Sequence, residues 1–323
     1  MMGEHMFVSA EPVTDRDRLH LLALCAVNDV NWSVIAREAQ RPGGLARLLE
    51  GEVTETSREG ESTRALLGAA LPHLDQLVER AHDEVQRAAT AVGARLVTVL
   101  DEGYPANLRV IPSPPPFLFY RGELCRDDTR SVAVVGTRKA SEEGVQRARE
   151  LARCLVVERV TVISGLAKGI DTAAHTATLA AGGRTIAVIG TGILSTYPRE
   201  NAALAEKIAA SGVVVSQFWP SASPTRHSFP MRNAVMSGIS QGTVVIEATA
   251  TSGAKMQARL ALEQGKRAFL MASLVTREAW ARSYLERGAI EVNSIDDVLH
   301  WLRSPEQVEA QSAQRNQLVL ELA

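Results

Sequence analysis

From position 131 onward, short runs of Val, Ile and Ala alternate with Gly- or Ser-containing turns and longer amphipathic segments. This alternation is typical of βαβ units, in which helices join parallel strands, and the near-continuous apolar runs indicate strands buried on both faces. We therefore predict a Rossmann-like, doubly wound α/β domain with a mostly parallel sheet. Strands are expected at 131–135, 160–164, 184–189, 212–216, 242–247 and 266–271, and helices at about 142–158, 171–181, 200–211, 231–240 and 253–264.

The segments before this domain follow a different pattern. Five short segments with apolar residues near helical spacing predict an all-α domain within 1–95. A structured connector, 96–130, follows; its prolines at 112 and 114–116 exclude a long helix, and short strands are expected at 95–100 and 117–120. The Rossmann-like domain spans 131–303, with two short helices expected near its end, and 304–323 is a polar tail expected to be mobile. The five helical segments are 17–27, 31–39, 43–50, 63–70 and 74–92.

The amino-acid composition is typical of a folded protein without disulfide bonds or a membrane span. The 323 residues suggest about two domains, and 46% hydrophobic with 22% charged residues is typical of a folded globular chain. The cysteines, Cys25, Cys125 and Cys154, are far apart and form no CxxC pair, which favours a reducing cytoplasm over a disulfide framework. We expect no membrane span, because no apolar stretch approaches the roughly 18 residues that a span needs. We expect no secretion signal, because the first residues lack a basic region followed by an apolar one.

Charge is unevenly distributed along the chain. Residues 131–273 hold 16 Lys and Arg against 9 Asp and Glu, whereas residues 1–130 hold 14 against 20 and residues 274–323 hold 5 against 8. A basic segment within an acidic chain indicates an anionic partner, because clustered cations concentrate phosphates. The alternative is that the excess only reflects solvated helix faces.

Ligands of open α/β sheets bind beyond the carboxyl ends of the strands, so the turns after the strands are the candidate sites. The first two turns combine glycines, which allow close backbone approach, with cations that suit a phosphate. Neither turn is a Walker A loop or a complete GxGxxG pattern, so plain strand-to-helix turns are the alternative. The candidates are Gly136, Thr137, Arg138 and Lys139 in the first turn, and Ser164, Gly165, Lys168 and Gly169 in the second.

Asp171 and His175 follow the second turn at positions i and i+4, which could suggest catalysis. No nucleophile accompanies them, so we predict that Asp171 caps the helix and that His175 is structural. We find no cluster of Cys, His, Asp and Glu with metal-ligand spacing and no Gly-x-Ser-x-Gly elbow. No catalytic residue, metal or cofactor is therefore predicted.

The turn after the fourth strand, 217–230, interleaves aromatic and basic residues, among them Trp219 and Phe229. Single-stranded nucleic-acid sites need this combination, because bases stack on rings while cations follow the backbone. Phe229 could alternatively fill the core. Further phosphates could bind at the third turn, 190–192, and at Ser252, Gly253 and Lys255 in the fifth.

Seven segments, in fixed order, resemble the DprA (Smf) family of DNA-processing proteins. The helical start resembles that family's N-terminal module of the sterile-alpha-motif (SAM) or helix-hairpin-helix type. The segments are YPANLRVIPSPPPFLFYRGEL (104–124), VAVVGTRKAS (132–141), ISGLAKGIDTAAH (163–175), GGRTIAVIGTGI (182–193), YPREN (197–201), FPMRN (229–233) and ERGAIEVNSIDDVL (286–299).

The resemblance implies a cytoplasmic, non-enzymatic protein that binds single-stranded DNA without sequence preference. It also implies a homodimer that loads the RecA recombinase during natural transformation and recombination. By the same resemblance, Arg138 and Lys168 contact phosphates, Phe229 meets a base, and Arg232 and Asn233 hold the strand. The winged-helix module of many family members is not expected, because only about 20 residues follow Arg303.

The chain departs from the family pattern at four places on the ligand edge: Gln217, Ala234, Ala254 and the pair Ala272-Ser273. Lys255 could replace the lost hydroxyl groups at the fifth turn. The departures leave open a nucleotide-binding sensor or a nucleotide hydrolase with Glu247 as its base. A scaffold that binds other proteins through the acidic helical start is a third hypothesis.

Overall fold

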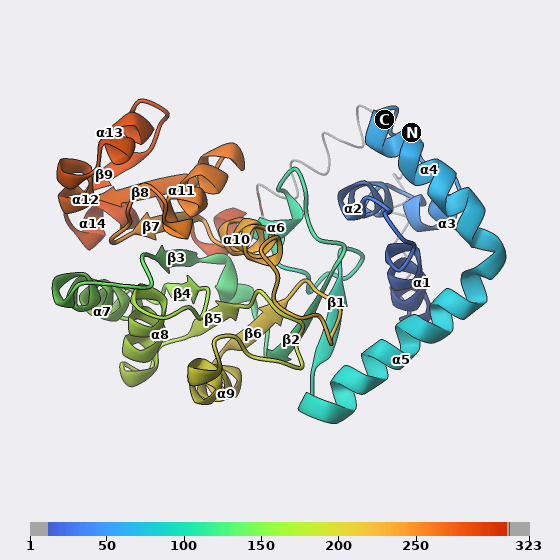
Figure 1. Ribbon diagram of the computed structural model, residues 1–323, viewed down its shortest axis with the longest axis horizontal. Helices are drawn as coiled ribbons and strands as arrows, with labels where there is room; N and C mark the ends of the chain where they lie inside the picture. Colours follow the sequence, from blue (N-terminus) through green and yellow to red (C-terminus); the bar gives the residue numbers. More distant parts are fainter. Residues whose placement is uncertain (1–11, 309, 311–323) are drawn as a thin grey trace, which may run out of the picture.

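The computed structural model describes residues 12–308 and 310. The five predicted N-terminal helices are present and lie beside a large sheet, with the fourth and fifth helices on the outer side (Figure 1). They are α1 (Asp15–Cys25), α2 (Trp32–Ala39), α3 (Gly44–Leu49), α4 (Arg58–Ala70) and α5 (Leu74–Val92), with a 3-10 turn, η1 (Leu71–His73), before α5.

Local capping explains where several of these helices begin and end. Thr14 and Asp17 form a reciprocal capping box at the start of α1. The Asn31 side chain accepts hydrogen bonds from the first backbone N–H groups of α2, and Ser57 does the same for α4. Gly93 ends α5 with φ of 63°, a left-handed conformation that suits glycine.

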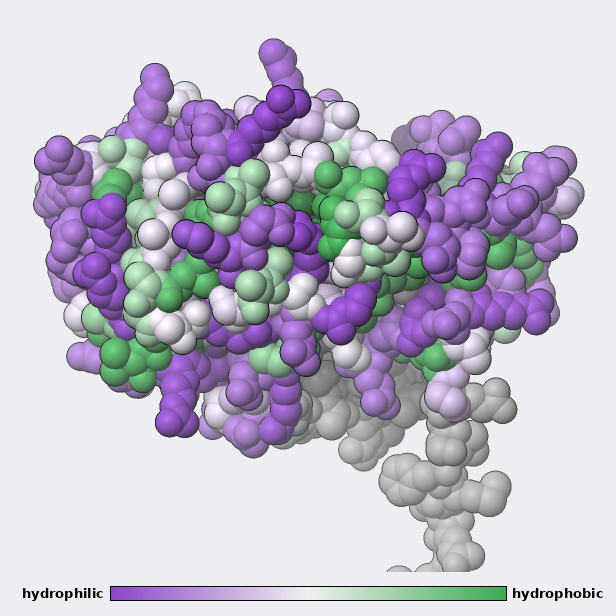
Figure 2. Space-filling model, turned by 90° about the horizontal axis from the view of Figure 1, so that it is seen from below, coloured by the Kyte–Doolittle hydropathy of each residue, from purple (hydrophilic) through white to green (hydrophobic). Residues whose placement is uncertain are grey.

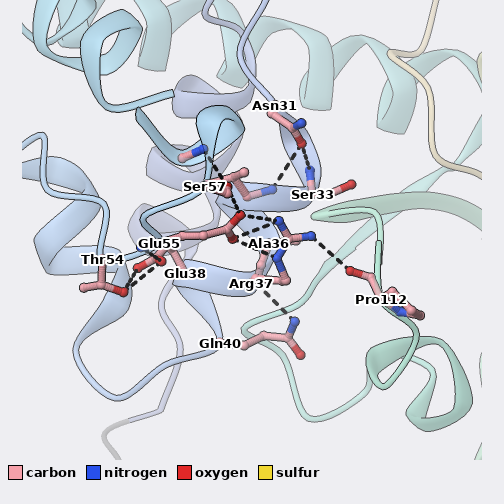
Figure 3. A network of polar contacts seen from close by, with 12 residues as sticks. Asn31, Ser33, Ala36, Arg37, Glu38, Gln40, Thr54, Glu55, Ser57 and Pro112 are labelled. Carbon is pink, nitrogen blue, oxygen red and sulfur yellow. Dashed lines mark hydrogen bonds and ion pairs between the residues drawn. The ribbon is translucent and has the colours of Figure 1, made fainter. Parts of the chain in front are cut away.

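Charged contacts join the helical module to the connector. Arg37 of α2 pairs with Glu55, 2.8 Å between Nη2 and Oε2, and donates from Nη1 to the Pro112 carbonyl at 3.0 Å (Figure 3). Arg18 of α1 pairs with the largely buried Asp101, 2.6 Å between Nη2 and Oδ1. Because the bonds to Pro112 and Asp101 cross from helices to connector, they set the position of the module relative to the sheet.

The sheet contains the six strands predicted for the Rossmann-like domain, the two predicted for the connector, and one strand, β9 (Ile290–Val292), that was not predicted. The other strands are β1 (Arg95–Thr98), β2 (Phe117–Gly122), β3 (Ser131–Val135), β4 (Thr161–Ser164), β5 (Thr185–Val188), β6 (Val213–Ser216), β7 (Gly242–Val245) and β8 (Arg267–Met271). Within the described residues they form one nine-stranded sheet in the order β1-β2-β6-β5-β4-β3-β7-β8-β9. The connector supplies β1 and β2, which pair antiparallel at the edge next to β6; the pairs from β6 to β9 are parallel.

Helices cover both faces of the sheet, as the doubly wound prediction requires. On one face lie α7 (Glu142–Val157), α8 (Ile170–Ala180) and α9 (Ala202–Ser211); on the other lie α10 (Ser228–Ile239) and α11 (Gly253–Glu263) (Figure 1). Alternate residues of β3 enter opposite cores: Val132 and Val134 pack with α7 and α8, whereas Ala133 and Val135 pack on the other side. The short helical turns are α6 (Ala106–Arg109), η2 (Arg126–Thr129) and η3 (Arg199–Asn201).

The two short helices predicted near the end of the domain are present as α13 (Ala279–Leu285) and α14 (Ile295–Leu299). The helix α12 (Ala272–Arg277) and the strand β9, which lies between α13 and α14 in the chain, were not predicted. A three-residue strand shows no clear periodicity, and it forms because Leu270 of β8 pairs with Glu291. Most of the polar tail lies outside the described residues, so its predicted mobility is untested.

Hydrophobic residues on the face shown in Figure 2 lie in small groups between hydrophilic ones. Among the described helices, none combines the length and the apolar character needed to cross a bilayer.

Candidate nucleic-acid interface

A cavity of about 390 Å³ lies beyond the carboxyl ends of β3 and β7. The chain leaves β3 toward β4 on one side, whereas β7 pairs with β3 on the other. The cavity therefore occupies the topological switch point, where doubly wound sheets bind ligands. It is lined by Val135, Gly136, Thr137, Arg138, Ala167, Asp171, Phe229, Arg232, Asn233, Met236, Thr249, Thr251, Ser252, Gly253, Ala254 and Gln257.

Three helices direct their amino-terminal turns at this cavity. Asp171 comes from the first turn of α8, Phe229 and Arg232 from that of α10, and Gly253 and Ala254 from that of α11. The last of these turns is capped by Ser252. Unpaired N–H groups and the helix dipole make such ends favourable for anions. The convergence therefore favours a phosphate or another anion in the cavity.

Arg232 and Asp171 form the buried floor of the cavity. Arg232 donates from Nη1 to the Val188 carbonyl at 3.0 Å and to the Gly165 carbonyl. Asp171 accepts from the N–H groups of Gly165, at 3.1 Å, and Ala167, at 3.3 Å. Burial lowers the pKa of Arg232 and raises the pKa of Asp171, and the attraction between the two groups opposes both shifts. Their bonds hold the second turn in shape.

The predicted role of Asp171 as the helix cap is wrong. The helix begins at Ile170, so its N-cap is Gly169, and the Asp171 carboxylate instead binds the preceding turn. His175 is fully buried with its Nδ1 atom 2.7 Å from Thr185 Oγ1. Because Thr185 donates its own hydrogen to a backbone carbonyl, it accepts one from His175.

Arg138 and Phe229 lie together at the mouth of the cavity. The guanidinium carbon of the exposed Arg138 is 5.3 Å from the centre of the half-buried Phe229 ring. The ring packs against Gly190, where an added Cβ would lie 2.9 Å from Phe229 Cδ1. A cation and an aromatic face thus lie side by side. A single-stranded nucleic acid requires both, because its bases stack on aromatic rings while cations neutralise its phosphates.

Other predicted ligands of the second turn are not cavity residues. Ser164 is buried, and its hydroxyl donates to a β3 carbonyl at 2.7 Å. Gly169 has φ of 78°, and an added Cβ would lie 2.4 Å from the Thr137 carbonyl oxygen, so glycine is needed to bring the two turns together. The exposed Lys168 reaches Glu200, 2.6 Å between Nζ and Oε1. The second turn thus supports the first, and only its lysine faces solvent.

The structure brings together eight of the fourteen predicted ligands: Gly136, Thr137, Arg138, Phe229, Arg232, Asn233, Ser252 and Gly253. Lys139 is exposed beyond the cavity, and Lys255 places its ammonium nitrogen 5.9 Å from the centre of the Trp280 ring. Lys255 is not among the residues that line the cavity, so its predicted replacement of the lost hydroxyl groups stays a prediction.

Several residues that line the cavity were not predicted from the sequence, chiefly Thr249, Thr251, Met236 and Gln257. The two threonines stand in the fifth turn. They could have been chosen by the rule that ligands bind beyond the carboxyl ends of the strands, which we call the strand-end rule. Met236 and Gln257 lie inside α10 and α11, and only the packing of those helices brings them to the cavity.

The loop between β6 and α10 is anchored by aromatic contacts. The Trp219 ring centre lies 5.2 Å from that of Phe117 in β2 and 6.3 Å from that of Trp32 in α2. Behind the loop, an added Cβ at Gly192 would lie 2.2 Å from the Trp219 and Pro220 carbonyl oxygens. The glycines of the third turn thus allow close packing of this loop, and neither is among the cavity residues that the structure describes.

The sequence matches one known protein family over most of its length. The model of the family described as DNA recombination-mediator protein A matches residues 95–303. The chain belongs to this family. The matched region includes every strand from β1 to β9 and every residue that lines the cavity.

Relatives and solved structures agree with this membership. Protein Smf of Synechocystis sp. is 40% identical over 179 residues, which cover 54% of this chain and 45% of that protein. The X-ray structure of DNA processing protein A (DprA) from Streptococcus pneumoniae has a TM-score of 0.72 at 28% identity, covering 90% of this chain and 99% of that one. DNA processing protein A from Helicobacter pylori, described for its unique single-stranded DNA binding mode, has a TM-score of 0.57 at 26% identity, covering 64% and 94%.

Proposed function

We propose that this protein binds single-stranded DNA at the cavity and its mouth, without catalysing a reaction on the strand. The observation that carries the proposal is the Arg138 guanidinium 5.3 Å from the Phe229 ring centre, at the mouth of a cavity that receives three helix amino-termini. The helix ends and Arg138 suit phosphates, and the ring suits a base. The single-stranded DNA binding described for the Helicobacter pylori protein supports the same function.

Binding without sequence preference follows from the same chemistry. Phosphates are identical along the strand, and every base has a face that can stack on Phe229. Family resemblance extends the proposal to loading of the RecA recombinase by a cytoplasmic homodimer during natural transformation and recombination. RecA filament assembly on an oligodeoxynucleotide, timed with and without this protein, tests that extension; an unchanged assembly rate would contradict it.

The test of DNA binding is a titration of labelled oligodeoxythymidylate at several salt concentrations. Wild type should bind more weakly as salt rises, because each phosphate contact releases counterions. The Arg138→Ala/Lys168→Ala double variant should bind more weakly than wild type and show a shallower salt dependence. Failure of wild type to bind at low salt would overturn the proposal.

A nucleotide ligand is the second candidate, and the volume of the cavity favours it. About 390 Å³ falls within the range of roughly 300 to 1,000 Å³ that is usual for small-molecule sites. The hydrolase version is weakened, because Glu247 accepts hydrogen bonds from Ser141 N at 3.1 Å and from Ser141 Oγ at 2.8 Å. Its carboxylate holds Ser141, the N-cap residue of α7, and Glu247 is not among the residues that line the cavity. Calorimetric titration with nucleoside monophosphates, beside the DNA titration, separates the two candidates.

A further inference from the structure

We propose that Tyr197 is a second base-stacking residue, which continues the binding track from the cavity mouth across the third turn. The inference rests on the proposed function and extends it to a residue that neither the turn glycines nor the cavity identifies. It makes the track long enough for two successive bases, one on Phe229 and one on Tyr197.

Exposure first distinguishes Tyr197 from most of the aromatic residues that the structure describes; Trp301 is the other exposed aromatic residue among them. The relative exposure of Tyr197 is 45%, although most large apolar side chains of the described structure are buried. Its hydroxyl has no hydrogen-bond partner among the described residues, so the phenol is not held as a structural donor. An aromatic ring held on a folded surface without a cover is suited to stack on a planar ligand.

The Tyr197 ring lies next to the residues at the mouth of the cavity. The centres of the Tyr197 and Phe229 rings lie 5.7 Å apart at an interplanar angle of 53°. The Arg138 guanidinium carbon lies 5.3 Å from the centre of the same Phe229 ring. Arg138, Phe229 and Tyr197 therefore form a continuous row that starts at the cavity.

The charges around the row favour a nucleic acid over an apolar ligand. The neighbouring turn carries Lys168, bound to Glu200 three residues after Tyr197, and Arg199 is exposed beside it. A strand whose phosphates follow these cations would bring its bases onto the rings. A purely apolar partner would leave Arg138 and Arg199 without neutralisation.

The test compares Tyr197→Ala, Tyr197→Leu and Tyr197→Phe with wild type. The probes are an oligodeoxythymidylate of about ten nucleotides and an abasic oligomer of the same length. We expect Tyr197→Ala and Tyr197→Leu to weaken binding of oligodeoxythymidylate by about tenfold, the scale of one lost stacking contact. Tyr197→Phe should bind as wild type, and the abasic oligomer should bind all four proteins equally.

Salt dependence separates stacking from charge. Tyr197→Ala should leave the slope of log affinity against log salt unchanged, whereas Arg138→Ala should make it shallower by about 0.7 for one phosphate contact on a single strand. Trp301→Ala is the matched control, because Trp301 is 41% exposed and stacks on Arg267 at the start of β8, away from the carboxyl ends of the strands.

Each outcome decides between the two proposals. If Arg138→Ala weakens binding and both Tyr197→Ala and Tyr197→Leu bind as wild type, the inference is overturned and the proposed function stands. Equal weakening on the abasic oligomer would also overturn it, because the loss would then not involve a base. If wild type binds neither probe at low salt, both proposals fail together. Melting temperatures of the variants verify that each one is folded.

Discussion

The indole ring of Trp219 lies 5.2 Å from the ring of Phe117, so the loop between β6 and α10 packs on the edge hairpin of the sheet. Trp32 of α2 lies against the same indole, with 6.3 Å between the ring centres. Arg87 of α5 adds a hydrogen bond to Ser221 Oγ at 3.2 Å. The helical module therefore supports the loop that leads to the candidate binding surface.

Trp219→Ala should lower the free energy of unfolding by about 2 to 3 kcal/mol, because it opens a cavity between three elements. It should also weaken oligodeoxythymidylate binding, because the loop that leads to Phe229 at the start of α10 loses its anchor. Chemical denaturation and titration of the folded variant measure the two effects. Trp219→Phe, which keeps an aromatic ring in place, should recover most of both; binding equal to wild type in the alanine variant would contradict the coupling.

Glu200→Gln should strengthen oligodeoxynucleotide binding several-fold. The Glu200 carboxylate lies 2.6 Å from the Lys168 ammonium, and its removal frees that cation for a phosphate. Lys168→Ala in the Glu200→Gln background should abolish the gain. Glu206→Gln removes an equal charge near Arg121 in α9 and β2, and serves as the control. A gain of the same size in the control would mean that only net charge matters.

Gly190→Ala should weaken DNA binding while the protein stays folded. The new methyl group would lie 2.9 Å and 3.1 Å from two carbon atoms of the Phe229 ring, so the ring must move. Overpacking of this kind costs about 1 to 3 kcal/mol of stability. Gly68→Ala in α4 is the control, because its added methyl group meets nothing within 4 Å. The two variants are compared by titration and by denaturation; unchanged binding by Gly190→Ala would contradict the role of the ring.

Stability should fall in acid because of His175. Burial lowers its pKa from 6.5 to about 3. Between these values the unfolded chain binds a proton that the folded protein does not, so the free energy of unfolding decreases as the pH falls. At pH 5 this contribution reaches about 2 kcal/mol. Denaturation at pH 7.5 and pH 5 should show that His175→Gln loses less stability than wild type; an equal loss would assign the acid sensitivity to other groups.

The sequence from 131 onward was sufficient to predict most of the sheet domain, because its apolar runs coincide with strands that are buried on both faces. Val132 and Val134 enter one core while Ala133 and Val135 enter the other, so an almost continuous apolar strand was the expected sequence signal. The same logic failed for Ile290–Val292, where pairing with β8 and not periodicity makes the strand.

For the candidate site, the strand-end rule found Arg138 and Phe229 but also selected Ser164 and Lys255. Ser164 follows the pattern of a phosphate-binding turn, yet its hydroxyl donates a hydrogen bond to the Val134 carbonyl of β3. Lys255 follows the pattern of a cationic helix start, yet its ammonium lies over Trp280. Residue type and spacing show which groups are near a strand end, but the direction of each side chain depends on its neighbours.

Local chemistry along the chain was sufficient for the alternation of strands and helices, the turn positions and the family resemblance, because each depends on residues close in sequence. Tertiary structure alone decided that Asp171 braces a turn, that Tyr197 meets Phe229, and that Trp219 joins the helical module to the loop. These contacts join segments distant in sequence, or turn a side chain away from its usual local role. The contacts of Tyr197 and Trp219 exist only once the folded chain has brought these distant segments together.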